Sequence, residues 1–348
     1  MRQRITVKDL ARAAGVSIGT VDRALNGRPG INVETRQRVL SAAETLGYRR
    51  NKLAQSLGRK SQIKIGCVFP SRYSFYPDIE AGINHAAATL ADHNVRVVSR
   101  RTENLGDERE GMFIDELVEA ENVSALALCP SHSTRLNQKI DELAARGVPI
   151  VTIATDAPAS RRLTCVSTDS FNNGQIAGDL MCGFLREGGR TVVLTGSLDV
   201  TDHERKVSGF SSVINGCPHG IEIAHVYETH DVAAECADAV THALQTYPEL
   251  RGIYVSTSTG ASACQALKDQ GRAGEVYLIG TDLFQQNIPF VQNGTIQALI
   301  FQNPFEQGRK AIEILYSHLS SDTRFGPTNF VIPSIITKHS VQHFRCYC

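Results

Sequence analysis

The sequence predicts an all-α helix-turn-helix head joined to an α/β body of two doubly wound parallel-sheet lobes. Apolar residues recur at helical spacing near the N-terminus, whereas from residue 62 onward short apolar runs alternate with helical stretches. The charge divides at the same place: residues 1–60 hold 13 Lys and Arg against 4 Asp and Glu, and the other 288 residues hold 23 against 32. A basic head on an acidic body is expected of a nucleic-acid-binding segment joined to another domain.

The head is predicted to form three short helices. The first begins at Thr6 and is ended by Gly15, and the second is capped by Ser17 and ends at residues 26–27. A third helix follows Asn32, whose side chain can cap its first turn. A helix, a tight glycine-containing turn and a second helix make a helix-turn-helix unit. From spacing alone, a generic three-helix bundle is an equally good interpretation.

The residue order in the head is more specific than its spacing. In sequence it reads Ala14-Gly15-Val16-Ser17, Thr20-Val21, Arg23, Leu25-Asn26-Gly27, Thr35-Arg36-Gln37-Arg38-Val39 and Leu46-Gly47-Tyr48. This string resembles the DNA-binding head of the LacI (lactose-repressor) family, and residues 51–57 resemble that family's hinge helix. The resemblance implies a DNA-binding domain over residues 1–49. It also implies a hinge helix and linker over residues 50–61 that folds when two subunits meet on palindromic operator DNA.

The same resemblance assigns DNA contacts. It places Ile18, Gly19 and Arg23 on the base-reading face of the recognition helix, where an arginine can reach guanine O6 and N7 bidentately. It places five residues on phosphates: Thr6, Ser17, Asn26, Tyr48 and Asn51. Leu57 corresponds to an apolar wedge inserted into the minor groove. Asp22 stands where a small residue is usual. Its carboxylate either accepts from a cytosine amine, repels phosphate, or pairs with Arg23 or Arg28.

The body is predicted from two series of β-α units, because continuous apolar runs bounded by turns are typical of buried parallel strands. The first series has strands at 63–69, 95–99, 125–129 and 149–153, with helices near 78–91, 108–120 and 135–146. The second has strands at 191–194, 221–226, 252–255 and 276–279, with helices near 172–186, 203–215, 232–246, 260–270 and 284–293. A tail completes the lobes with a strand at 298–301, a helix at 304–319 and a strand at 329–336. We expect the first lobe at about 62–162 and 295–322, and the second at about 163–294 and 323–348.

An ordered series of motifs in the body supports a second resemblance. The motifs are Phe75-Tyr76, Pro149-Ile150-Val151-Thr152, Ser167-Thr168-Asp169 with Gly174 and Gly178, Gly209-Phe210, Gly280-Thr281-Asp282, and Gln302-Asn303-Pro304 with Gly308. Together they resemble the type I periplasmic sugar-binding protein fold, which the LacI family joins to its DNA-binding head. The resemblance implies that residues 62–348 bind a small effector, a sugar or polyol, and form a homodimer. It also implies a transcriptional repressor controlled by that effector.

Candidate effector contacts lie beyond the carboxyl ends of the predicted strands, where such sheets bind ligands. Tyr73, Phe75 and Tyr76 can stack on a sugar ring. Asp156, Asp282 and Gln302 can pair with hydroxyls. The alternatives are that the two aspartates cap turns and that Phe75 and Tyr76 belong to the core. Family members usually place Arg three residues before the Gly-Phe pair, where this chain has Lys206. Because lysine is a point charge, either the ligand differs or the neighbouring Arg205 substitutes.

Other function classes find little support in the sequence. It has no Gly-x-Gly-x-x-Gly after a strand, no phosphate-binding loop and no Gly-x-Ser-x-Gly nucleophile turn between a strand and a helix, so an enzyme is not expected. The cluster at residues 202–204, Asp-His-Glu, is predicted to be a solvated helix start. The nine cysteines lack Cys-x-x-Cys spacing and the histidines are not spaced as metal ligands, so no metal site or disulfide framework is expected. No cofactor is predicted either. No signal peptide or apolar span is evident, which predicts a cytoplasmic protein with no membrane partner. A sugar-binding protein or carbohydrate-acting enzyme without a regulatory role is the alternative.

Overall fold

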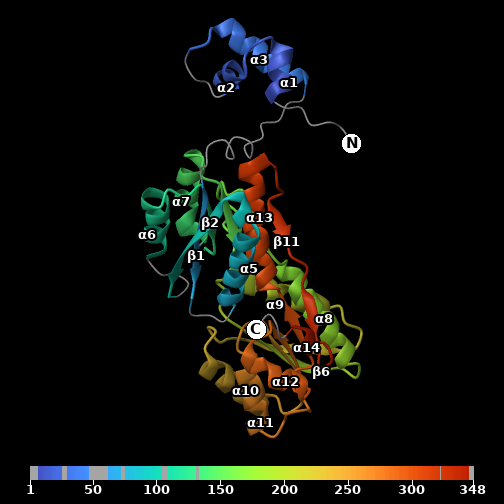
Figure 1. The fold of residues 1–348 in the computed structure, drawn as a ribbon. Coiled ribbons are helices and arrows are strands. Elements are labelled where there is room, and N and C mark those ends of the chain that lie inside the picture. The colour runs from blue at the N-terminus through green and yellow to red at the C-terminus, as the bar shows by residue number, and fades with distance from the viewer. Residues whose placement is uncertain are drawn as a thin grey trace. The chain divides into compact units, whose positions relative to one another are not determined.

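A computed structural model describes residues 7–25, 30–46, 62–71, 75–103, 109–130, 133–321 and 323–344. The chain divides into a small unit, residues 1–61 with 317–323, and a large unit, residues 62–316 with 324–348. Figure 1 shows the head helices in blue and the α/β body in the remaining colours. Within the described residues, no helix is long and apolar enough to cross a membrane.

The head contains the three helices that the sequence predicts, α1 (Val7–Ala14), α2 (Ile18–Leu25) and α3 (Val33–Thr45). Gly15 follows α1 with a φ of +64°, a conformation in which a side chain would be strained. Asn32 caps α3, because its Oδ1 accepts from the backbone N–H of Thr35 at 2.7 Å. The three helices share a small core made by Leu10, Ala11, Ala14, Val21, Ala24 and Val39.

The first lobe is built on a parallel six-stranded sheet in the order β11-β5-β4-β3-β1-β2. Its strands are β1 (Ile63–Pro70), β2 (Val95–Thr102), β3 (Ala125–Leu128), β4 (Ile150–Ile153), β5 (Thr164–Ser167) and β11 (Thr328–Phe330). Its helices are α5 (Tyr76–Thr89), η1 (Ala91–His93), α6 (Arg109–Asp115), the π-helical turn η2 (Glu116–Ala120), α7 (Ser133–Ala145) and α13 (Pro304–Ser321). Apolar side chains of α6, η2 and α7 pack on the strands in one buried cluster.

The second lobe has a six-stranded sheet in the order β12-β10-β9-β8-β6-β7, in which only the pairing of β12 with β10 is antiparallel. Its strands are β6 (Gly189–Thr195), β7 (Ile221–Glu228), β8 (Leu250–Val255), β9 (Tyr277–Thr281), β10 (Ala298–Phe301) and β12 (Ser334–Ile336). Its helices are α8 (Ser170–Phe184), α9 (Thr201–Ile214), α10 (Ala233–Thr246), α11 (Gly260–Asp269), η3 (Gln285–Asn287), α12 (Ile288–Gln292) and α14 (Val341–Phe344). Helices α8 and α9 cover one face of the sheet, and α10, α11, α12 and α14 cover the other.

Sheet membership corrects the lobe boundaries predicted from the sequence. Strands β5 and β11 belong to the first sheet, and β10 belongs to the second. The predicted strand at 329–336 is in fact two strands, β11 and β12, one in each sheet. Residues 331–333, which include Pro333, separate them, and proline cannot donate a ladder hydrogen bond. The chain therefore crosses between lobes three times: after β5, after β10 and between β11 and β12.

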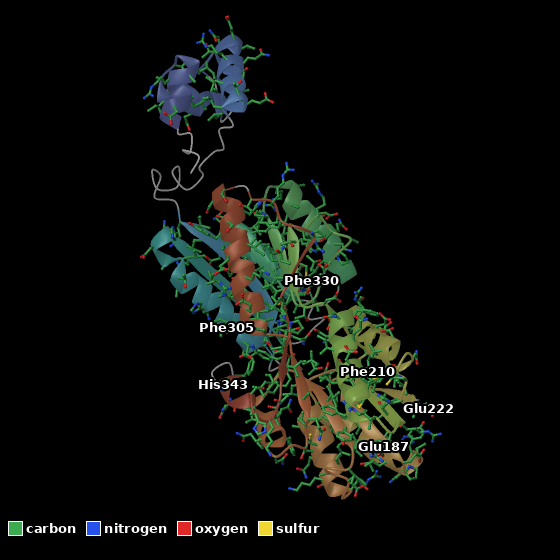
Figure 2. All side chains as sticks on the ribbon, turned by 90° about the vertical axis from the view of Figure 1, so that its right-hand side faces the viewer. Glu187, Phe210, Glu222, Phe305, Phe330 and His343 are labelled. Atoms are coloured by element: carbon green, nitrogen blue, oxygen red, sulfur yellow. The ribbon has the colours of Figure 1, made fainter. Side chains whose placement is uncertain are left out.

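Glycines allow close helix packing in the second lobe. A Cβ added to Gly174 of α8 would clash with the carbonyl oxygen of Lys206, and one added to Gly209 of α9 would clash with that of Phe171. The next residue, Phe210, is fully buried in this lobe (Figure 2). The close approach of α8 and α9 at Gly174 and Gly209 fixes the position of α9. The first turns of α9 carry several of the polar residues described below.

Candidate ligand-binding site

A cavity of about 120 Å³ opens between the two lobes of the body. Nearly all the residues around it follow the carboxyl end of a strand, where open α/β sheets bind ligands. The first lobe contributes Phe75, Tyr76, Ala154, Thr155, Thr168 and Gln307. The second lobe contributes Val200, Asp202, His203, Lys206, Asp231, Ser256, Thr257, Ser258, Thr281, Asp282 and Phe284. Gln302 lies on the crossing after β10.

Asp282 is the most enclosed carboxylate of the cavity, with 3% of its surface exposed. Its Oδ1 accepts from the backbone N–H of Gln302 at 2.7 Å, and its Oδ2 accepts from Gln302 Nε2 at 2.6 Å. Burial raises the pKa of Asp282 to about 6, although the Gln302 hydrogen bonds and the Lys206 charge lower it. The carboxylate is therefore fixed in place and can accept further hydrogen bonds from a ligand.

Gln302 connects the carboxylate of Asp282 to the crossing after β5. Its Oε1 accepts from Thr168 Oγ1 at 3.2 Å and from Asn173 Nδ2 at 3.4 Å. Thr168 directly follows β5, and Gln302 directly follows β10. The carboxylate of Asp282, which lines the cavity, is thus linked by hydrogen bonds to two of the three crossings.

Lys206 is paired inside the protein. Its Nζ lies 2.9 Å from Asp202 Oδ2, one helical turn earlier in α9, and Ser170 Oγ donates to the other oxygen of Asp202. Burial lowers the pKa of Lys206, but the charge and hydrogen bond of Asp202, together with Tyr254 and Asp282, outweigh burial and leave the pKa raised. Burial likewise raises the pKa of Asp202, but Lys206 and Ser170 bring it below its usual value. Both side chains therefore stay charged.

His203 is held as a neutral donor. The backbone N–H of Ser197 donates to its Nδ1 at 3.1 Å, which leaves the ring proton on Nε2. Burial lowers the pKa of His203, and the nearby charge of Lys206 lowers it further, although Asp231 and Asp202 raise it. A Cβ on Gly196 would clash with the His203 ring, so this position requires glycine.

Three residues around the cavity have left-handed backbone conformations. Ala154, Asp231 and Asp282 have φ angles of +63°, +57° and +57°. Such a conformation costs about 1–3 kcal/mol in a residue with a side chain, and it clusters at binding sites. Each follows the end of a strand, so the backbone turns sharply where the side chain meets the cavity.

Aromatic side chains form the apolar part of the wall. The rings of Phe75 and Tyr76 meet edge to face, with centroids 5.6 Å apart and an interplanar angle of 88°. Phe284 comes from the other lobe and is buried. Aromatic faces combined with polar groups fit a ligand that has both an apolar face and hydroxyl groups.

The structure brings together some of the predicted contacts and not others. Phe75, Tyr76, Lys206, Asp282 and Gln302 all lie around the cavity. Tyr73 lies outside the described residues.

Two predicted contacts are not among the residues around the cavity. Asp156 forms an ion pair with Arg162 and accepts from the backbone N–H of Ala157 at 2.7 Å, so it stabilises a turn. The side chain of Arg205 is half-exposed, and its Nη2 lies 3.5 Å from Asp169 Oδ1.

The prediction of a solvated cluster at residues 202–204 is wrong for two of its members. Asp202 and His203 line the cavity, and only Glu204 is exposed. A signal was present in the sequence: Asp202 and Lys206 stand four residues apart after a strand, a spacing that places opposite charges on one helix face. Asp231, Phe284 and Gln307 also line the cavity and were not predicted.

The predicted base-reading residues lie on helix α2. Ile18, Gly19 and Arg23 are exposed, and 49% of the Ile18 surface is accessible. Asp22 is half-buried on the same helix. Ser17 caps α2, because its Oγ accepts from the backbone N–H of Thr20 at 3.1 Å. The other predicted DNA contacts lie outside the described residues: Thr6, Asn26, Tyr48, Asn51 and Leu57.

Comparison with known proteins matches both parts of the chain. Residues 65–323 match the family of periplasmic binding protein domains, and residues 6–51 match the bacterial regulatory proteins of the lacI family. The chain is 23% identical to catabolite control protein A of Priestia megaterium over 325 residues, 92% of this chain and 94% of that protein. It is 26% identical to the ribose operon repressor of Halalkalibacterium halodurans over 283 residues, 80% of each chain. A sugar-binding protein of a sugar ABC transporter from Bacillus halodurans has a TM-score of 0.75 at 22% identity, covering 81% of this chain and 100% of that one.

A helix-turn-helix head and a two-lobed body around a cavity, in one chain, define a DNA-binding transcriptional regulator. Within that class, the chain belongs to the LacI family of bacterial regulatory proteins, with a periplasmic binding protein domain as its body. The relatives that it matches are regulators rather than enzymes.

Proposed function

We propose that this protein is a repressor whose binding to a palindromic operator is controlled by a small sugar or polyol in the interlobe cavity. The observation that carries the proposal is the cavity itself, which is lined by the fixed carboxylate of Asp282 and by the aromatic residues Phe75 and Tyr76. A carboxylate can accept two ligand hydroxyls while a ring stacks on the apolar face of a sugar. The name of the related ribose operon repressor joins a sugar to repression and supports the same assignment.

Residues 1–49 are proposed to bind DNA, with residues 50–61 as hinge helix and linker and residues 62–348 as effector-binding and dimerisation domain. The exposed Ile18, Gly19 and Arg23 on α2 supply the side of the helix that faces bases. One helix-turn-helix unit buries little surface, so two heads on neighbouring half-sites gain affinity through effective concentration. A cytoplasmic homodimer on a palindromic site follows from this assignment.

Operator selection combined with ligand titration tests the proposal. The full chain is used to select duplexes from a random DNA library, and the selected site is titrated with and without members of a sugar and polyol panel. A palindromic site is expected, and one ligand should both raise the melting temperature and change operator affinity. Turnover of a sugar by a chain that selects no DNA site would overturn the proposal.

A further inference from the structure

Two cysteines of the second lobe lie at the carboxyl ends of α8 and α9. Cys182 is in the last turn of α8, and Cys217 comes three residues after the end of α9. The backbone N–H groups of Gly216 and Cys217 each donate three residues back at 3.0 Å, so the chain continues in tight turns as far as Cys217. Both side chains pack on the same apolar cluster, which α8 and α9 form with the sheet.

The close packing of α8 on α9 brings the two thiols together. The close approach at Gly174 continues one turn later at Gly178, where an added Cβ would lie 2.7 Å from the Cβ of Val213. Cys182 comes four residues after Gly178, which is one further turn of the helix. Cys217 comes four residues after Val213. The two residues are therefore neighbours across the helix pair, and the Cys182 thiol donates a hydrogen bond to Cys217.

Solvent can reach this pair of thiols. Both Cys182 and Cys217 are half-buried, whereas the other free cysteines in the described part of the chain are buried: Cys67, Cys129, Cys165, Cys236 and Cys264. Burial raises the pKa of Cys182 to about 12, and its hydrogen bond with Cys217 and the charges of Cys217 and Asp179 act in the same direction. Cys182 therefore stays protonated at neutral pH, which leaves Cys217 as the sulfur that attacks an electrophile.

We propose that Cys182 and Cys217 form a redox-sensitive dithiol site that a peroxide oxidises to a disulfide. The sulfur of Cys217 attacks one oxygen of hydrogen peroxide, and the O–O bond breaks to give a sulfenic acid and water. The sulfur of Cys182 then attacks that of Cys217, the S–O bond breaks, and the hydroxyl group leaves as water with the proton of Cys182. Two thiols and one peroxide thus give one disulfide and two waters, and the electrons lost by sulfur reduce the peroxide.

The disulfide joins the far ends of two helices that are already linked at their near ends. Ser170, in the first turn of α8, donates to Asp202, in the first turn of α9. The new bond closes the chain between residues 182 and 217 into a loop, which restricts the unfolded state. The melting temperature should therefore rise by about 5–10 °C on oxidation and fall back when dithiothreitol is added. This response concerns the second lobe alone and does not depend on the identity of the effector.

Thiol counting on the full chain tests the proposal. Cys346→Ser and Cys348→Ser are introduced first, because both cysteines lie outside the described residues, and seven of the nine cysteines then remain. Hydrogen peroxide applied to the folded protein should remove two of the seven thiols, counted after denaturation. The mass should fall by about 2 Da, the two hydrogens lost, whereas a gain of about 16 or 32 Da would indicate separate sulfenic or sulfinic acids. Such a gain, or a chain that keeps all its thiols, would overturn the proposal.

Two serine variants and a control identify the pair. Cys182→Ser and Cys217→Ser should each abolish the disulfide and with it the rise in melting temperature. Cys264→Ala is the control, because Cys264 is buried on α11 in the same lobe, and this variant should still lose two thiols to peroxide. If Cys182→Ser or Cys217→Ser formed a disulfide as readily as the unchanged chain, another pair would be responsible and the assignment would be wrong.

Discussion

The side-chain amide of Gln302 donates to the carboxylate of Asp282, with Nε2 2.6 Å from Oδ2. Gln302 stands where the chain crosses from β10 to α13, and its Oε1 accepts from Thr168 at the crossing after β5. A ligand that binds Asp282 therefore acts directly on residues whose backbone must change if the lobes move. An effector shifts an equilibrium between two conformations only by its difference in affinity for them. Contacts through Asp282 are one source of such a difference.

Asp282→Asn should separate effector binding from DNA binding. Asparagine tolerates the φ of +57° at this position, so the backbone need not rearrange. Because the charge and one acceptor are lost, the free energy of effector binding should weaken by about 1.5–3 kcal/mol. Operator affinity in the absence of effector should stay unchanged. Calorimetry with the effector and anisotropy with labelled operator measure the two quantities. Normal effector affinity in the variant would show that Asp282 only hydrogen-bonds Gln302 at the crossing after β10 and does not bind the effector.

The pKa of His203 predicts a loss of stability in mild acid. Its folded pKa lies below the ordinary 6.5, mainly through burial, so below pH 6.5 the unfolded chain binds more protons than the folded one. The stability that neutral His203 contributes is thus present above pH 6.5 and is lost as the pH falls from there toward its folded pKa. His203→Asn keeps an acceptor for Ser197 and removes the titration. Calorimetric melting at pH 7.5 and 5.5 should show a smaller drop for the variant, and equal drops would contradict the assignment.

A glycine pair tests the close packing of α8 on α9. Gly209→Ala should cost about 1–3 kcal/mol of unfolding free energy, because its Cβ would clash with the carbonyl oxygen of Phe171. Gly183→Ala in α8 is the control, since a Cβ there meets nothing within 4 Å. In a helix it should stabilise the protein by up to about 1 kcal/mol. Urea unfolding compares the two variants, and similar stability changes would show that α9 can shift freely.

The head helices and most of the β-α order of the body could be predicted because both depend on local apolar spacing and capping residues, but no strand was predicted at residues 164–167, where β5 lies. Asn32, for example, caps α3 as its sequence context indicates. Sheet membership could not be predicted, because β5, β10 and β11 are runs of only three or four residues, and β11 pairs with β5, which is distant in sequence. Nothing in an apolar run tells which of two sheets it joins.

The carboxylates of the site show the same limit. Asp156 and Asp282 both follow a strand, and only the fold shows that Arg162 turns back to pair with Asp156. Asp202 looks solvated in sequence because it opens a helix beside charged neighbours. Its place in the cavity depends on the packing of α9 on α8, a tertiary contact that its immediate neighbours do not encode.

Arg23→Ala tests the base-reading role of α2. If Arg23 bonds a guanine edge, its removal should cost about 1–3 kcal/mol per half-site and relax the preference at one base position. Competition between the selected operator and single-base variants, measured at fixed salt, gives the preference directly. The fixed salt matters because phosphate contacts make all DNA affinities of a basic head salt-dependent.

Arg12→Ala provides a matched control that removes the same charge from a different place. Arg12 lies in the last turn of α1, with 83% of its side chain exposed and its Nη1 3.9 Å from Asp9. Because each variant lowers the charge of the head by one, non-specific DNA binding should weaken by a similar factor in both. Base preference should change only in Arg23→Ala, since a lost phosphate attraction acts equally on all sequences. If Arg23→Ala kept the full base preference, Arg23 would not read bases and would contribute only its positive charge to DNA binding.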